Sequence, residues 1–133
     1  MSPSDDFVRK WVLKADNDLT IAQDERNVGR ENIVTDGICF HCQQASEKML
    51  KAFLTKHRID FKKVHNLEYL AQLCMRIDPD FASIEFGNLS GYGAAIRYPD
   101  DFYMPTLQET DECLRLAKGV RTFVGRKLGI SPL

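Results

Sequence analysis

Basic and aromatic side chains in two short stretches are the groups of this sequence whose types and spacing best suit ligand chemistry. They are Lys62, Lys63 and His65 in the first stretch, and Arg97 and Tyr98 in the second. Cationic side chains and the free amides at a helix start bind phosphate, and an arginine or a tyrosine stacks on a nucleobase. The pattern therefore predicts an anion or nucleotide site between the two stretches.

A third set of polar side chains, Gln44, Lys48 and Lys51, is spaced four and three residues apart. This spacing puts them on one face of a helix, and we include them in the candidate site. The structural alternative is that Gln44 and Lys48 line a solvated surface. Glu47 and Lys51 are an i,i+4 pair that such a surface would use in any case.

The residues of the first two stretches have structural alternatives as well. Lys62 and Lys63 can belong to a solvated loop, and Arg97 can neutralise a helix end. Tyr98 can pack under the proline that follows it. His65 can hydrogen-bond across the first turn of the helix that follows it.

A helix from about Ile33 to Lys56 is expected to position these groups. Small or apolar residues recur along it every three or four positions, which places them on one buried stripe. The stripe consists of Ile38, Cys42, Ala45, Met49 and Ala52. Further apolar residues widen this surface, namely Phe40, Leu50, Phe53 and Leu54. The helix is therefore expected to lie centrally and to contact neighbours on two sides.

Two further helices are predicted on either side of the central one. The first runs from about Ser4 to Gln23 and has a buried stripe of its own. That stripe is Val8, Trp11, Ala15, Leu19 and Ala22. A shorter helix is predicted to begin after Asn66, which suits its N-cap, and to end at Asp78 and Pro79.

The remaining two predicted helices differ in the regularity of their patterns. The segment from about Pro79 to Ile96 is only roughly periodic, and glycines interrupt it, each costing about 1 kcal/mol relative to alanine in a helix interior. The last helix begins with a capping box of Thr106 and Glu109 and ends near Leu128 and Gly129. Since no sustained strand alternation is present, the sequence predicts an all-α, up-and-down bundle of four to five helices.

Length and composition indicate a single soluble domain over residues 1–133. Hydrophobic residues make up 44% of the chain and charged residues 28%, which is ordinary for a globular protein. The net charge of −1 argues against wholesale binding of a nucleic-acid backbone. No apolar run reaches the roughly 20 residues of a membrane span, and the N-terminal residues lack a secretory pattern. We therefore expect a cytoplasmic protein without membrane contact.

The four cysteines, Cys39, Cys42, Cys74 and Cys113, include one C-x-x-C pair. A zinc or redox site with His41 is one interpretation, and small reduced core residues are the other. Structural zinc usually needs four well-spaced ligands, and the sequence has no second pair. We therefore expect core residues, no metal site and no cofactor.

Four segments of the sequence form a recognisable series: WVLKADNDL (11–19), CFHCQQASEKMLKAFL (39–54), VHNLEYL (64–70) and IRYPD (96–100). Through them the sequence resembles the HEPN domain family of small all-helical proteins associated with nucleotide binding. Their order and spacing cover most of the chain, and the central segment is the most specific. Several of the candidate site residues fall within these segments.

The resemblance implies an up-and-down bundle that usually forms a homodimer. Such proteins are often encoded beside a minimal nucleotidyltransferase, sometimes as a toxin–antitoxin pair. The resemblance therefore implies a nucleotide ligand and a nucleotidyltransferase partner. Apolar surface beyond one stripe per helix, including Phe40, Leu50 and Leu54, would also suit a twofold interface if it is exposed.

Some members of this family are metal-independent ribonucleases that carry an arginine and a histidine a few residues apart, late in the bundle. In this sequence no histidine follows Arg97, and Arg58 and His65 lie in the loop after the central helix. We therefore assign no catalytic residue and do not favour RNA as a ligand. A nucleotide-binding or regulatory partner of a nucleotidyltransferase is the favoured function. A HEPN-type ribonuclease toxin and a purely structural dimeric module are the alternatives.

Overall fold

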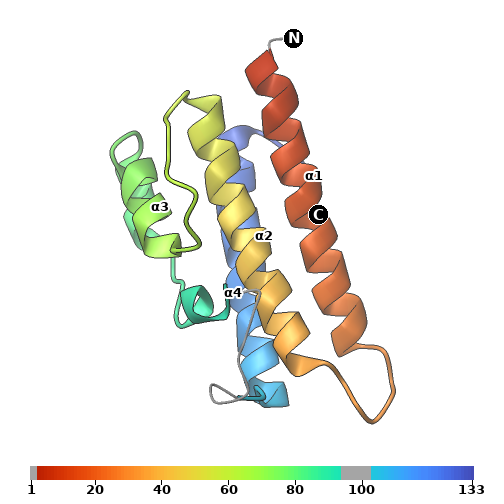
Figure 1. The fold of residues 1–133 in the computed structure, drawn as a ribbon. Helices are drawn as coiled ribbons and strands as arrows, with labels where there is room; N and C mark the ends of the chain where they lie inside the picture. Colours follow the sequence, from red (N-terminus) through yellow and green to blue (C-terminus); the bar gives the residue numbers. More distant parts are fainter. Residues whose placement is uncertain (1–2, 94–102) are drawn as a thin grey trace.

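The computed structural model describes residues 3–93 and 103–133, and these form an all-helical bundle. The elements in chain order are α1 (Pro3–Arg26), α2 (Thr35–Lys56), α3 (Leu67–Met75), the 3-10 turns η1 (Pro79–Ser83) and η2 (Leu89–Tyr92), and α4 (Leu107–Leu128). Figure 1 shows α2 between α1 and α3, with α4 behind it. The described residues contain no strand, which confirms the predicted all-α class.

Helix α2 lies at the centre of the bundle, as its apolar pattern predicts. The five residues of its predicted stripe are each at most 1% exposed. Leu50 and Leu54 are fully buried within the chain as well. Those two residues are therefore unavailable for contact with a second subunit, and the expectation that they contribute to an interface is wrong.

Helices α1 and α4 cover α2 and carry the expected end signals. Ala15, Leu19 and Ala22 of α1 are buried against the core. At the start of α4, the Thr106 side chain accepts from the Glu109 amide and Glu109 bonds back to Thr106, so the predicted capping box is confirmed. Gly129 follows α4 with φ 71°, the left-handed conformation that suits glycine after a helix.

The helix predicted from Pro79 to Ile96 is wrong over its described part, residues 79–93. This stretch forms η1 and η2, joined by residues without helical structure. Gly87 has φ +51°, which no α-helical residue adopts. Phe81 and Leu89 are buried and fasten the two turns to the core, whereas residues 94–96 lie outside the described part.

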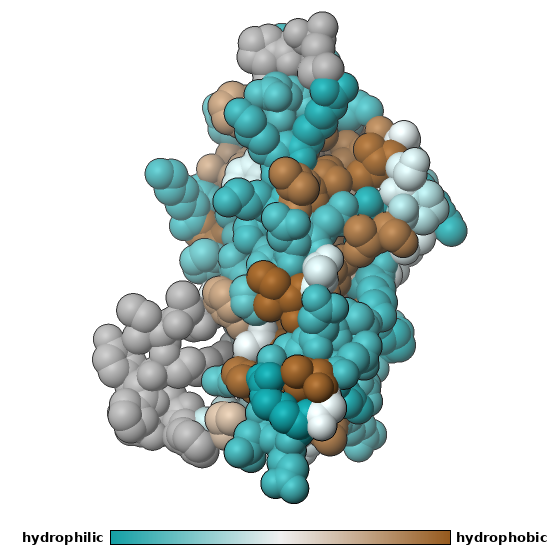
Figure 2. Space-filling model, turned by 90° about the vertical axis from the view of Figure 1, so that its right-hand side faces the viewer, coloured by the Kyte–Doolittle hydropathy of each residue, from teal (hydrophilic) through white to brown (hydrophobic). Residues whose placement is uncertain are grey.

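The outer surface of α1 is polar with isolated apolar groups. Figure 2 shows this side of the molecule, where apolar side chains are scattered among hydrophilic ones. Phe7, Leu13 and Ile21 are each about half exposed, at 57%, 61% and 48%. Among the helices of the described residues, none is long and apolar enough to cross a bilayer.

Candidate functional site

The structure describes six of the eight predicted site residues, and these lie in two places. Gln44, Lys48 and Lys51 lie on α2. Lys62, Lys63 and His65 lie in the α2–α3 loop, residues 57–66. Arg97 and Tyr98 lie outside the described residues.

A buried carboxylate on α2, Glu47, joins these two places. It is 3% exposed, and its two oxygens contact Lys51 Nζ and His65 Nδ1, each at 2.8 Å. Burial by itself would raise the pKa of Glu47, but the hydrogen bonds from Lys51 and His65 lower it below the ordinary value. The Lys51 ammonium also lies 5.6 Å from the ring centres of Trp11 and Phe61. Glu47 is therefore ionised and fastens the α2–α3 loop to α2.

The contact with Glu47 fixes the orientation of the His65 ring. An ionised carboxylate only accepts hydrogen bonds, so Nδ1 of His65 donates and Nε2 is left for other contacts. The His65 side chain remains 62% exposed. The first-turn hydrogen bond considered from the sequence is not its contact, because Glu47 takes Nδ1.

Gln43 lies beside this pair and is fully buried. Its Nε2 donates to the backbone oxygen of His65 at 2.8 Å, and its Oε1 accepts from Gln44 Nε2 at 2.8 Å. A Cβ on Gly93 would come within 2.9 Å of the Gln43 amide and 3.1 Å of His65 Cβ. The chain therefore passes close over Gln43 and His65 at Gly93, four residues before Arg97.

The sequence interpretation missed Gln43 and Glu47. The sequence pattern that could have indicated them is their i,i+4 spacing beside the apolar stripe. Each directly follows a buried residue of α2. Polar residues at such positions also occur on solvated helix faces. Only the fold brings in His65, 18 residues after Glu47, as their common partner.

Lys48 belongs to a second polar cluster, on the α1 side of α2. Its Nζ contacts Asp18 Oδ2, and Asp18 Oδ1 contacts His41 Nδ1 at 2.8 Å. Asp18 is 7% exposed. The three α2 residues predicted to share one face thus have separate contacts, since Gln44 bonds Gln43, Lys48 bonds Asp18 and Lys51 bonds Glu47.

The predicted phosphate-binding amides at the start of α3 already have partners. The Leu67 amide donates to Ser90 Oγ at 3.0 Å, and the Tyr69 amide donates to the Asn66 side chain at 2.8 Å. Asn66 is therefore the N-cap, as the sequence predicts. Glu68 places a negative charge in the same turn. This helix start is poorly suited to an anion.

The remaining cations of the α2–α3 loop are uncompensated. Lys62 and Lys63 are exposed, and neither ammonium forms an ion pair with the described residues. The backbone amide of Lys62 donates to the Tyr69 hydroxyl at 3.3 Å, and the Lys62 ammonium takes no part in this contact. Of the candidate residues that the structure describes, Lys62, Lys63 and His65 are the ones that face solvent with groups able to bind an anion.

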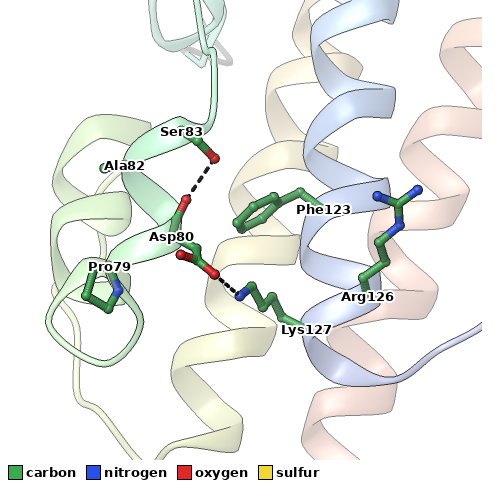
Figure 3. Close-up of a pocket in the computed structure, with 7 residues that line it drawn as sticks. All are labelled: Pro79, Asp80, Ala82, Ser83, Phe123, Arg126 and Lys127. Atoms are coloured by element: carbon green, nitrogen blue, oxygen red, sulfur yellow. Dashed lines mark hydrogen bonds and ion pairs between the residues drawn. The ribbon is translucent and has the colours of Figure 1, made fainter.

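None of the predicted site residues that the structure describes lines either of two surface pockets. Figure 3 shows the first, about 550 Å³, between η1 and the end of α4. Its Lys127 ammonium lies 2.7 Å from both Asp78 and Asp80, and these contacts raise the pKa of Lys127. The charge of Lys127 is therefore already balanced by these two carboxylates. This makes the pocket less suited to an anion. The second pocket, about 560 Å³, lies around η2.

That second pocket includes two tyrosines that share one carboxylate. The Tyr92 hydroxyl donates to Glu109 at 3.1 Å, and the Tyr103 hydroxyl donates to the other oxygen of Glu109. Glu68 also lines this pocket. Among the described residues that line this pocket there is no lysine or arginine, and Glu68 adds a negative charge, so this part of the lining is poorly suited to phosphate.

All four cysteines are buried and free. A hydrogen bond with Cys113 and burial raise the pKa of Cys39, and burial raises that of Cys74 to about 12. Burial also raises the pKa of Cys42, whereas the hydrogen bond with Cys39 lowers that of Cys113. Thiols with a raised pKa stay protonated near neutral pH, which makes Cys39, Cys42 and Cys74 poor metal ligands and nucleophiles. Over residues 3–93 and 103–133, no cluster of histidine, cysteine or acidic side chains could hold a metal ion.

Comparison with known proteins identifies a family but no individual relative. No curated protein and no solved structure matches the chain. A family model described as the HEPN domain matches residues 8–128, which is nearly the whole chain and includes all four α-helices in whole or in large part. Together with the all-α bundle and the central α2, this match shows that the chain belongs to the HEPN domain family.

Proposed function

We propose that this HEPN protein is a dimeric, nucleotide-binding or regulatory partner of a nucleotidyltransferase, of the kind found in toxin–antitoxin pairs. The observation that carries the proposal is the α2–α3 loop. It presents two exposed lysines without ion pairs among the described residues, next to an imidazole held with one nitrogen free for a ligand.

The position of this loop supports a shared site with the second stretch of the sequence. Gly93 packs against Gln43 and His65, and Arg97 and Tyr98 follow it by four and five residues. A phosphate bound to Lys62 and Lys63 would leave Arg97 or Tyr98 to stack on the base. Lys51 serves the site indirectly, through the Glu47 carboxylate that also bonds His65. Lys48 bonds Asp18 in the other cluster and is not part of this site.

Calorimetry with ATP and the other ribonucleoside triphosphates tests nucleotide binding. We expect Lys62→Ala combined with Lys63→Ala to weaken binding by roughly tenfold or more, since hydrogen bonds to charged groups contribute about 1.5–3 kcal/mol. Arg97→Ala should weaken it as well. Arg76→Ala is the matched control, because Arg76 is exposed and lies at the far end of α3. Absence of binding by the unmodified protein would overturn the proposal.

The oligomeric state and the partner are tested separately. We expect sedimentation to show a particle of twice the 15.2 kDa chain mass. A nucleotidyltransferase encoded beside this chain should co-purify with it. A monomer at high concentration would remove the dimer from the proposal, and an adjacent gene of unrelated function would remove the partner.

Ribonuclease activity is the outcome that would replace this proposal. The sequence has no histidine after Arg97, and proton transfer near neutral pH usually uses one. We therefore expect single-stranded RNA to stay intact when incubated with the protein. Cleavage that disappears in His65→Ala would identify a ribonuclease instead.

A further inference from the structure

We propose that His65 contacts a phosphate of the bound nucleotide through Nε2, and that Glu47 and Gln43 are positioning residues for this contact. The inference rests on the proposed function and names the part of the ligand that the imidazole meets. It assigns to two buried residues of α2 a role in a site whose ligand-facing groups lie in the α2–α3 loop.

The position of the His65 ring is determined from two directions. Glu47 Oε1 lies 2.8 Å from Nδ1, and Gln43 Nε2 lies 2.8 Å from the His65 backbone oxygen. Gln43 Nε2 also lies 3.2 Å from Glu47 Oε1, so the amide and the carboxylate hold each other. Because Glu47 and Gln43 are 3% and 0% exposed, water competes little for these bonds. The backbone oxygen and the ring Nδ1 of His65 are therefore both held in place.

The tautomer follows from the charge of Glu47. The Nδ1 position carries a proton, since an ionised carboxylate accepts only. Nε2 is then a hydrogen-bond acceptor in the neutral ring and a donor in the protonated ring. A phosphate oxygen accepts hydrogen bonds, so it pairs with the protonated form.

Charge favours a phosphate over a hydroxyl group at Nε2. From α2, Glu47 faces the ring, and Lys51 balances its charge. From the loop itself, Arg58, Lys62 and Lys63 add three positive charges and Asp60 adds one negative charge, and none of these groups forms an ion pair among the described residues. From α3, Glu68 is the charged group of the first turn, and its carboxylate accepts the Ser90 hydroxyl. The described surroundings of His65 are thus positive overall, which complements an anion.

A purely structural role for His65 is the alternative, in which the bond to Glu47 only holds the loop. Two substitutions separate the roles. In His65→Asn the side-chain amide takes the place of Nδ1 and keeps a donor for Glu47, but nothing remains at Nε2. In His65→Gln the amide reaches the place of Nε2 instead. His41→Asn is the matched control, because His41 also bonds a carboxylate through Nδ1 but lies on the α1 side of α2.

The experiment measures ATP affinity by calorimetry and stability by thermal unfolding for each variant. His65→Asn should retain the melting temperature and weaken ATP binding roughly tenfold, since one charge-assisted hydrogen bond is lost. His65→Gln should lose stability and retain more of the affinity. His41→Asn should bind ATP like the unmodified protein.

His65→Asn binding ATP as tightly as the unmodified protein would overturn the inference and leave the proposed function standing. No ATP binding by the unmodified protein or by any variant would overturn both.

Discussion

Two carboxylates, Asp18 and Glu47, form clusters of similar composition at two places along α2. Each bonds one imidazole through Nδ1 at 2.8 Å and one lysine ammonium of α2. In the Asp18 cluster, both partners come from α2, so the cluster joins two helices. In the Glu47 cluster the imidazole comes from a loop.

The two clusters differ most in the exposure of the imidazole. The side chain of His41 is 29% exposed, whereas that of His65 is 62% exposed. Burial of the carboxylates runs in the opposite order, at 9% exposed for the Asp18 side chain and 4% for the Glu47 side chain. The more deeply buried carboxylate thus holds the more accessible ring. The comparison teaches that similar hydrogen-bond chemistry joins two helices at one place and orients a solvent-exposed imidazole at another.

The largest effect is expected from Glu47→Ala. This change leaves the buried Lys51 ammonium without its carboxylate and removes one of the two acceptors of Gln43 Nε2. Breaking a buried ion pair costs about 3–5 kcal/mol. Urea unfolding should show a free energy of unfolding lowered by this amount. The double variant Glu47→Leu with Lys51→Met removes both charges and should be much closer to the unmodified protein. Equal losses in the single and double variants would mean that the pair is not the cause.

Gly93→Ala tests how closely the chain packs on the Glu47 cluster. The added Cβ would lie 2.9 Å from the Gln43 amide, which its hydrogen bonds hold in place. Overpacking of this kind costs about 1–3 kcal/mol, measurable by the same unfolding experiment. Gly91→Ala is the control, since a Cβ there meets nothing within 4 Å. If both variants have the stability of the unmodified protein, the close approach at Gly93 is wrong.

Asp18→Ala should cost less than Glu47→Ala, about 1–2 kcal/mol, because water can reach the partners it leaves behind. The side chains of Lys48 and His41 are 20% and 29% exposed, against 9% for Lys51. Thermal unfolding of the two alanine variants side by side measures the difference. A larger loss for Asp18→Ala would reverse the order drawn from burial.

The smallest expected effect is a difference in acid stability. The pKa of Glu47 is lowered in the folded protein, so its stabilisation is present above the pKa of an unfolded glutamate, about 4.3. It is lost as the pH falls through the lower, folded pKa. Glu47→Gln should therefore be less stable than the unmodified protein near neutral pH, and the gap should narrow in acid. A gap of constant size over an acid titration of stability would contradict the lowered pKa.

The sequence predicted those features of the fold whose residue pattern lies within a single helix. The apolar stripe of α2, the Asn66 cap and the capping box at Thr106 are local patterns, and all three are confirmed. The helix predicted after Pro79 failed because glycine conformations such as that of Gly87 are invisible in a periodic pattern.

The candidate site was less predictable because its contacts are tertiary. Lys48 and Lys51 are neighbours on one helix, yet their ammonium groups bond different carboxylates. Gln43 and Glu47 resemble solvated helix positions until the loop brings His65 onto them. Spacing along a helix predicts which residues share a surface, but which charges are balanced there depends on distant segments.

The shared carboxylate of Glu109 couples two segments that are apart in the sequence. Tyr92 and Tyr103 bond the same side chain, so η2 and the residues just before α4 are held at one point of α4. A substitution at Glu109 would therefore release both segments together, and their local stabilities should rise and fall as one.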